Sequence, residues 1–199
     1  MSAAAPRILG IAGSPRRHGN SDRLLDECLA GARAAGAEID RLVVSAAGIA
    51  PCRGCNLCSR DGKCVVGDGM QDVYPRLDAA DAIVVASPVY FATVPAVLKC
   101  LYDRCQPYWA RRYVLGQPIE RRRPGALLLV GGGGDPYGHE CASTTTRSVF
   151  AVLGVDHTAE LAIHADSPSD AGRLPEALER VREIGESLAR DASERLGGV

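Results

Sequence analysis

Five short, mostly apolar runs alternate along the chain with longer segments in which apolar residues recur at helical spacing. The runs predict β-strands. They lie at residues 7–12, 38–44, 82–86, 126–130 and 159–163. The third run, AIVVA, is continuous and rich in β-branched residues, which is typical of a parallel strand covered on both faces.

The segments between the runs predict helices, because their apolar residues share one helical face. They lie at residues 21–35, 70–80, 95–105, 140–153 and 174–196. Residues 45–68 and 106–124 lack this pattern and are expected to be irregular. Five β-α repeats favour one parallel sheet with helices on both faces. We therefore expect an α/β, flavodoxin-like three-layer sandwich with strand order 2-1-3-4-5.

Length and charge limit the possible functions. The 199 residues suit one domain, residues 1–199. A net charge of −1 argues against bulk electrostatic binding to nucleic acid or to an anionic membrane. No apolar run approaches the roughly 20 residues that span a bilayer, and the N-terminus lacks the pattern of a signal peptide. We expect a cytoplasmic protein with neither a nucleic-acid nor a membrane partner.

Residues 10–21, GIAGSPRRHGNS, join the first strand to the first helix and have the composition of an anion site. The first turn of a helix has unpaired N–H groups and the positive end of the helix dipole. Ser14, Asn20 and Ser21 add short polar side chains, and Arg16 adds charge. The loop matches neither a P-loop nor GxGxxG, so it suits the single phosphate of FMN. The alternative is an ordinary turn whose Ser and Asn cap the helix.

Two further loops leave the third and fourth strands, which neighbour the first strand in the expected order. Residues 87–91, SPVYF, offer backbone groups to a planar ring, and the glycines at 131–134 allow a ligand to lie on bare backbone. All three loops would then converge on one crevice. The alternatives are a tight turn with buried aromatics and a flexible loop. Among the histidines, only His139 is expected near enough for proton transfer.

Four of the eight cysteines form the pattern Cys52-x2-Cys55-x2-Cys58-x5-Cys64. In a reducing compartment, clustered cysteines more often bind metal or perform redox chemistry than form disulfides. This spacing is typical of cluster-binding ferredoxins, whereas structural zinc usually has two separate CxxC pairs. We interpret residues 50–66 as a loop that holds a [4Fe–4S] cluster. Zinc, a Cys55/Cys58 redox disulfide and free thiols are the alternatives.

The other cysteines and the arginine-rich segment receive simpler interpretations. Cys28, Cys100, Cys105 and Cys141 are expected to be packing residues. The arginines between residues 109 and 123 are expected on a solvated surface. Alternatively, they receive the phosphates of a nicotinamide cofactor or an acidic protein partner.

The combined motifs resemble the NADPH-dependent FMN reductase superfamily, and more narrowly its iron–sulfur flavoprotein branch. The matching motifs, in chain order over about residues 7–165, are GSPRRHGNS, PCRGCNLCSRDGKC, GDGM, SPVYF, LKCLYDR and the glycine loop. The resemblance implies FMN and a homodimer or homotetramer. It implies a phosphate site made by Ser14, Arg16, Asn20 and Ser21. It implies an isoalloxazine site made by Pro88, Val89, Tyr90, Phe91, Gly132 and Gly133. It implies cluster ligation by Cys52, Cys55, Cys58 and Cys64.

From this pattern we expect an FMN-dependent oxidoreductase that couples FMN to a [4Fe–4S] cluster. NAD(P)H is the candidate electron donor, and the redox partner is a small molecule or a protein such as a ferredoxin-like donor. No catalytic side chain is assigned, because flavin chemistry needs no protein nucleophile. One alternative is an NAD(P)H-dependent FMN or quinone reductase without a cluster. Another is a zinc-stabilised or thiol-based redox-sensing module.

Overall fold

A five-stranded parallel sheet in the order β2-β1-β3-β4-β5 forms the centre of the protein. The computed structural model describes residues 4–133, 136–167 and 170–197. The strands are β1 (Arg7–Ala12), β2 (Glu38–Val43), β3 (Ala82–Pro88), β4 (Arg123–Gly131) and β5 (Val155–His164). The flavodoxin-like fold class and the strand order expected from the sequence are confirmed.

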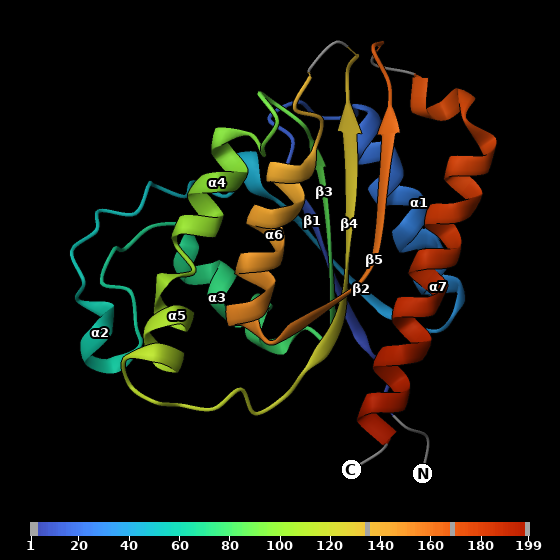
Figure 1. Ribbon diagram of the computed structural model, residues 1–199. Helices are drawn as coiled ribbons and strands as arrows, with labels where there is room; N and C mark the ends of the chain where they lie inside the picture. The colour runs from blue at the N-terminus through green and yellow to red at the C-terminus, as the bar shows by residue number, and fades with distance from the viewer. Residues whose placement is uncertain (1–3, 134–135, 168–169, 198–199) are drawn as a thin grey trace.

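Helices cover both faces of the sheet (Figure 1). On one face lie α1 (Asn20–Ala34) and α7 (Pro175–Gly197). On the other lie α3 (Met70–Ala79), α4 (Ala96–Asp103), α5 (Gln106–Tyr113) and α6 (Glu140–Leu153). The short elements are α2 (Cys58–Asp61), η1 (Val44–Ala46) and η2 (Asp170–Arg173). No helix in these described ranges is both long and apolar enough to cross a membrane.

The central strand β3 supplies side chains to two separate cores. Ile83 and Val85 belong to the core under α3–α6, whereas Ala82 and Val84 belong to the core under α1 and α7. Alternate residues of a strand point to opposite faces, which explains this division. Burying a Val or Ile completely contributes roughly 1.5–3 kcal/mol. The carboxyl end of β3 is therefore rigidly held in the middle of the sheet edge.

Two of the sequence-based boundaries are wrong around the arginine-rich segment. Residues 106–113 form helix α5 instead of an irregular stretch, and Pro107 is compatible with its first turn because those N–H groups have no partner within the helix. Strand β4 begins at Arg123, where the buried guanidinium donates to the carbonyls of Leu77, Ala80 and Leu153. Arg123 is thus not part of a solvated surface.

The isolated cysteines differ from one another in environment. Cys28 and Cys105 are buried, as expected of packing residues. Helix α4 ends at Asp103, so Cys105 lies at the start of α5 and not on the helix that carries the half-buried Cys100. Cys141 is exposed, and its assignment as a packing residue is wrong.

Close backbone contact joins α1 to α7. A Cβ on Gly185 would lie 1.8 Å from the carbonyl oxygen of Cys28, and a Cβ on Gly31 would lie 2.2 Å from that of Arg182. Only glycine allows the two helices to approach this closely. The backbones of the two helices are consequently in direct contact with each other.

Candidate functional site

Three loops meet at the carboxyl edge of the sheet, at the top of Figure 1. They follow β1, β3 and β4, which are neighbours in the sheet. The amide of Gly13 donates to Ala86 O at 2.8 Å, which joins the first loop to β3. The amide of Val89 donates to Val130 O at 2.8 Å, which joins the second loop to β4. The structure therefore brings together the three loops that the sequence singled out; we call this edge the rim.

The loop after β1 leaves the start of α1 without a side-chain cap. The N-cap residue is Gly19, and no side chain makes a cap hydrogen bond there. Ser14 and Ser21 are both buried, and the Ser14 hydroxyl accepts the amide of Arg16 at 3.0 Å. The N-terminus of α1 is thus available to an anion, and the interpretation that Ser and Asn merely cap this helix is wrong.

Asn20 has its side chain directed to the segment around η2. Its Nδ2 donates to Ser167 O at 2.7 Å, and its Oδ1 accepts the amide of Ala171 at 3.1 Å. Both ends of the amide are engaged in this structure. Only one of the two Nδ2 N–H groups is used in these bonds, so the predicted contact between Asn20 and a phosphate can be made by the other one.

The loop after β3 turns sharply and exposes an aromatic ring. Tyr90 and Thr93 exchange backbone hydrogen bonds of 2.8 and 3.1 Å. Between them, Phe91 and Ala92 have φ angles of 50° and 62°. A left-handed conformation costs a non-glycine residue roughly 1–2 kcal/mol, and Phe91 is 98% exposed. The turn is tight as expected, but Phe91 is not buried, and strain of this kind is common at ligand-binding loops.

The loop after β4 rests on the end of β5. The amide of Gly133 donates to Asp166 Oδ1 at 3.2 Å, and Asp166 Oδ2 lies 3.0 Å from His164 Nε2. These two groups hold the pKa of Asp166 below its usual value. A Cβ on Gly133 would lie 2.7 Å from the His164 ring, so a larger residue there would displace that side chain. Gly134, which the sequence also assigned to this loop, lies outside the described residues.

A cavity of about 230 Å³ opens beside this third loop. Its lining includes Val89, Gly132, His139 and His164. His139 is at the rim, as the sequence predicted, with its Nε2 3.8 Å from a Glu160 carboxylate oxygen. The sequence analysis did not predict His164 and Asp166. The one signal for them is their position, because His164 ends the last strand and Asp166 follows it by two residues.

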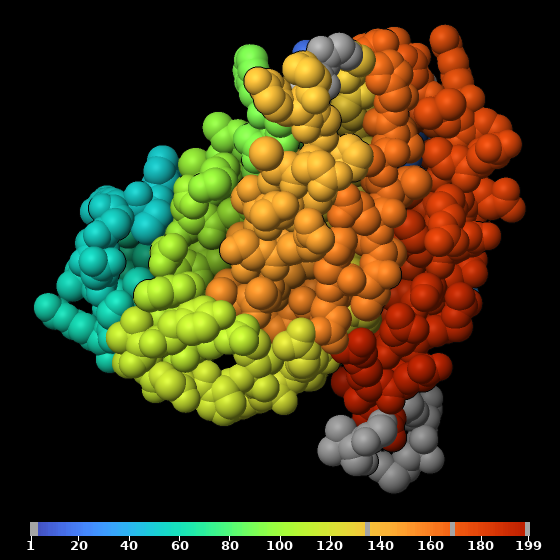
Figure 2. All heavy atoms as spheres, in the orientation of Figure 1, coloured from blue at the N-terminus to red at the C-terminus, as the bar shows by residue number. Residues whose placement is uncertain are grey.

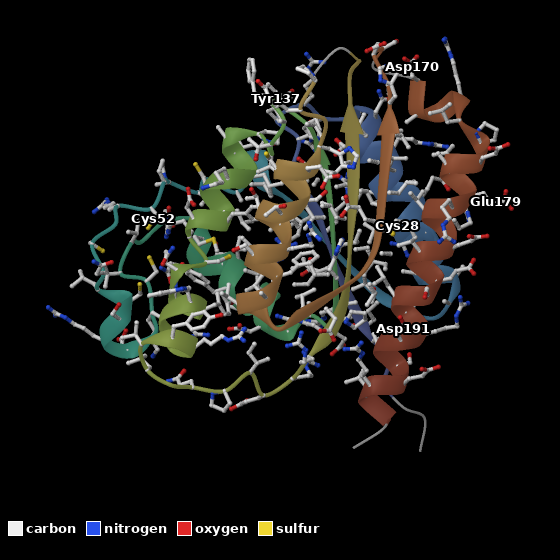
Figure 3. All side chains as sticks on the ribbon, in the orientation of Figure 1. Cys28, Cys52, Tyr137, Asp170, Glu179 and Asp191 are labelled. Carbon is white, nitrogen blue, oxygen red and sulfur yellow. The ribbon has the colours of Figure 1, made fainter. Side chains whose placement is uncertain are left out.

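The cysteine loop begins at the same sheet edge but lies on the flank of the molecule. Figure 3 places Cys52 beside α4 and α5, well away from Tyr137 at the rim. Cys52, Cys55, Cys58 and Cys64 all line one cavity of about 360 Å³. Within the described ranges, no three or more His, Cys, Asp or Glu side chains are arranged to hold a metal ion.

Arg104 ties the two ends of the cysteine loop together. Its guanidinium is 1% exposed and donates to Ala50 O at 2.9 Å and to both carboxylate oxygens of Asp68 at 2.6 and 2.9 Å. The amide of Ala50 also donates to Asp68 at 2.7 Å. Hydrogen bonding to Arg104 lowers the pKa of Asp68 to about 2. Sequence reasoning missed this pair, although both residues lie within motifs that it quoted.

The chemistry of the four thiols fits a metal centre. Burial raises the pKa of Cys58, and repulsion from the other three sulfurs raises it further. For Cys64, burial is outweighed by hydrogen bonds from the Val66 amide, Tyr74 and Arg104, so that its pKa is lowered. Thiolate is the form that binds metal. The other three sulfurs thus oppose a thiolate at Cys58, and a cation among them would relieve that repulsion.

Comparison with known proteins identifies the family. The family model for NADPH-dependent FMN reductase matches residues 6–166. The chain belongs to this family. The match covers β1 to β5 and so includes all three rim loops and the cysteine loop.

Relatives within the family are iron-sulfur flavoproteins. One from Archaeoglobus fulgidus is 29% identical over 185 residues, which cover 92% of this chain and 79% of the relative. One from Methanocaldococcus jannaschii is 32% identical over 147 residues, which cover 73% and 71%. One from Methanosarcina thermophila is 37% identical over 126 residues, and the chain spans only 63% of its length.

Solved structures share the fold at low sequence identity. An NAD(P)H:quinone oxidoreductase from Methanothermobacter marburgensis has a TM-score of 0.67 and 17% identity, over 93% of this chain and 98% of that one. A flavone reductase has a TM-score of 0.66 and 19% identity, over 94% and 63%. Both likenesses confirm the flavodoxin-like architecture.

Proposed function

We propose that this chain is an FMN-dependent oxidoreductase that couples FMN at the rim to a [4Fe–4S] cluster in the cysteine loop. The observation that carries the proposal is that four cysteines line one cavity, namely Cys52, Cys55, Cys58 and Cys64. The chain that contains this cavity belongs to the FMN reductase family, and the family match includes the rim loops. The names of the relatives support the same pairing of groups.

At the rim, the first loop would hold the phosphate of FMN. Ser14, Ser21 and Arg16 would provide hydrogen bonds and charge at the start of α1, and Asn20 would join them through its second Nδ2 N–H group. Pro88, Val89, Tyr90 and Phe91 would contact the isoalloxazine, with Gly132 and Gly133 closing the site. The exposed, strained Phe91 supports this assignment, because a planar ligand would cover it.

The residues of each site suit electron exchange. Flavin exchanges electrons in pairs or singly and a cluster exchanges them singly, so together they connect two-electron and one-electron partners. The chain itself would position the two redox groups and offset their negative charge. Backbone N–H groups of the rim would stabilise negative charge on the ring, and Arg104 would offset the negative charge of a thiolate at Cys64. His139 would hold a proton near the ring.

The separation of rim and cysteine loop favours exchange between subunits. Within one chain the cysteines lie on the flank and the flavin loops at the carboxyl edge (Figure 3). A homodimer or homotetramer would bring the cysteine loop of one copy to the rim of another. NAD(P)H or a ferredoxin-like protein would serve as donor, and we expect the protein in the cytoplasm.

A cluster-free NAD(P)H-dependent FMN or quinone reductase is the second candidate. The same separation favours this function, because FMN at the rim could then react without a cluster in the cysteine loop. Under that function the cysteines would bind zinc or remain free thiols. A purely redox-sensing module is the third candidate and would leave the rim without flavin.

Anaerobic purification followed by quantification of FMN, iron and zinc tests the proposal. We expect flavin absorption together with a broad brown band that dithionite bleaches. Cys58→Ala should remove iron and leave FMN bound. Cys141→Ala, the exposed cysteine outside the loop, is the matched control and should keep both. Full iron in Cys58→Ala, zinc in place of iron, or protein without flavin would each refute part of the proposal.

A further inference from the structure

A second large cavity lies at the amino edge of the sheet, opposite the rim. It has a volume of about 590 Å³, is open to the surface, and is lined by α5, the segment that follows it, and the start of β4. Figure 2 shows the surface hollowed at the bottom of the molecule, within the yellow-green segment that leads from α5 to β4. Pockets that bind small molecules have volumes of roughly 300–1,000 Å³.

The lining of this cavity is predominantly basic. Five basic side chains face three acidic ones. The basic residues are Lys63, Arg111, Arg112, Arg121 and Arg123, and the acidic residues are Asp61, Asp78 and Glu120. Asp78 already accepts the Tyr108 hydroxyl at 2.8 Å. We call this site the basic cavity.

Arg123 is a buried cation with no carboxylate in direct contact, and Asp78 and Asp81 attract it only from a longer distance. It is 6% exposed, and no carboxylate of the described residues lies within 4 Å of it. Its Nη atoms donate to three backbone carbonyls, but its Nε has no hydrogen-bond partner in the described part of the chain. Burial, with repulsion from Arg121, lowers its pKa. A buried guanidinium in this situation is costly unless an anion comes near.

Two more guanidinium groups are fixed in place without an ion pair. Arg111 donates to Gly62 O at 2.9 Å and lies 4.9 Å from the centre of the Tyr108 ring. Arg112 donates to Ala151 O at 2.8 Å and lies 5.0 Å from the Tyr113 ring. Each guanidinium has five N–H donors, so both keep donors for a ligand. Backbone carbonyls and aromatic rings therefore hold the guanidinium groups of Arg111 and Arg112 in position before any ligand binds.

We propose that the basic cavity binds a diphosphate-bearing anion. Guanidinium groups match phosphate oxygens in bidentate pairs, and several groups from different elements suit a ligand with more than one phosphate. The cavity wall includes Asp61 and Lys63, so the anion would lie against the cysteine loop. The site goes beyond the proposed function. It lies at the edge of the sheet opposite the rim, so an anion bound there needs no electron exchange with the flavin.

Calorimetric titration of the FMN-loaded protein with pyrophosphate and with ADP tests the proposal. We expect one site per chain and an affinity that falls as NaCl is raised. Arg123→Gln removes three internal hydrogen bonds and endangers folding, so Arg112→Gln is the main variant. It should weaken binding about tenfold, which corresponds to about 1.4 kcal/mol. Arg190→Gln, an exposed α7 residue paired with Glu186, removes the same charge and should change affinity less than about twofold.

The nature of the anion follows from comparing the two ligands. Tighter binding of ADP than of pyrophosphate identifies a nucleoside diphosphate, whereas equal binding, or binding of pyrophosphate alone, shows that only the diphosphate group is recognised. No saturable binding, an unchanged affinity in Arg112→Gln, or an equal loss in Arg190→Gln would overturn the proposal. Missing flavin or iron would refute the proposed function and leave this site standing.

Discussion

The guanidinium of Arg104 connects two motifs that are far apart in the sequence. Asp68 lies in GDGM and Arg104 in LKCLYDR, and the two form a buried, bidentate ion pair. The sequence shows both residues, but nothing in their spacing links them, because the pair forms only when α4 packs beside the end of the cysteine loop. The rim residues were easier to predict, since each directly follows an apolar strand.

Asp68→Asn should destabilise the protein by about 3 kcal/mol, because it leaves a buried guanidinium without its counter-charge. Urea unfolding at neutral pH measures the loss. Asp103→Asn is the matched control: Asp103 forms a half-exposed pair with Lys99, and the expected change is below about 1 kcal/mol.

The pH dependence of the unfolding free energy distinguishes a contribution of the Asp68–Arg104 ion pair from a contribution of packing alone. The folded pKa of Asp68 is about 2, below its ordinary value near 4, so its ionised form stabilises the fold above the ordinary value. That stability is lost as pH falls from about 4 towards 2. The difference between wild type and Asp68→Asn should therefore shrink over this range, and a difference that stays constant would contradict the assignment.

At the scale of elements, the sequence predicted most helices and strands but misjudged the arginine-rich segment. Apolar periodicity was sufficient for β3 and α6, whose buried positions are regular. In α5, Arg111 and Arg112 obscured a short helix that buries Tyr108 and Ala110. The burial of Arg123 depends on three carbonyls at the ends of α3 and α6, and no local pattern reveals such partners.

Gly185→Ala should destabilise the contact between α1 and α7. The added methyl group would meet Cys28 O at 1.8 Å, and overpacking of this kind costs about 1–3 kcal/mol. For a chain of this length the melting temperature should fall by roughly 5 °C. Gly172→Ala has no atom within 4 Å of the new methyl group and serves as the control. Equal effects of the two substitutions would contradict the tight helix contact.

For the whole molecule, the topology could be predicted but the position of the cysteine loop could not. Parallel β-α repeats leave few arrangements for the sheet, and the observed order is the expected one. The loop after β2 starts at the carboxyl edge, the same edge as the three rim loops. Its contacts with α4 and α5 instead draw the cysteines to the flank.

Hydrogen exchange on protein with and without FMN should reveal this separation. FMN should slow exchange in residues 13–19, 89–93 and 131–133, because it covers the rim loops. Residues 52–64 should be unaffected in dilute protein. Protection of residues 52–64 that grows with protein concentration would indicate a second copy docked at the rim. Equal protection at every concentration would contradict the separation within one chain.

The two ends of the cysteine loop are hydrogen-bonded to each other, so the loop is a segment that could be replaced as a unit. Ala50 and Asp68 are hydrogen-bonded to each other, and the amide of Gly69 donates to Gly48 O at 3.3 Å. Doubling the length of a flexible loop costs only about 0.6 kcal/mol once its ends are joined. Foreign sequences grafted between residues 51 and 66 should therefore be carried without disturbing the sheet, so that the scaffold could accept other redox centres at the same position.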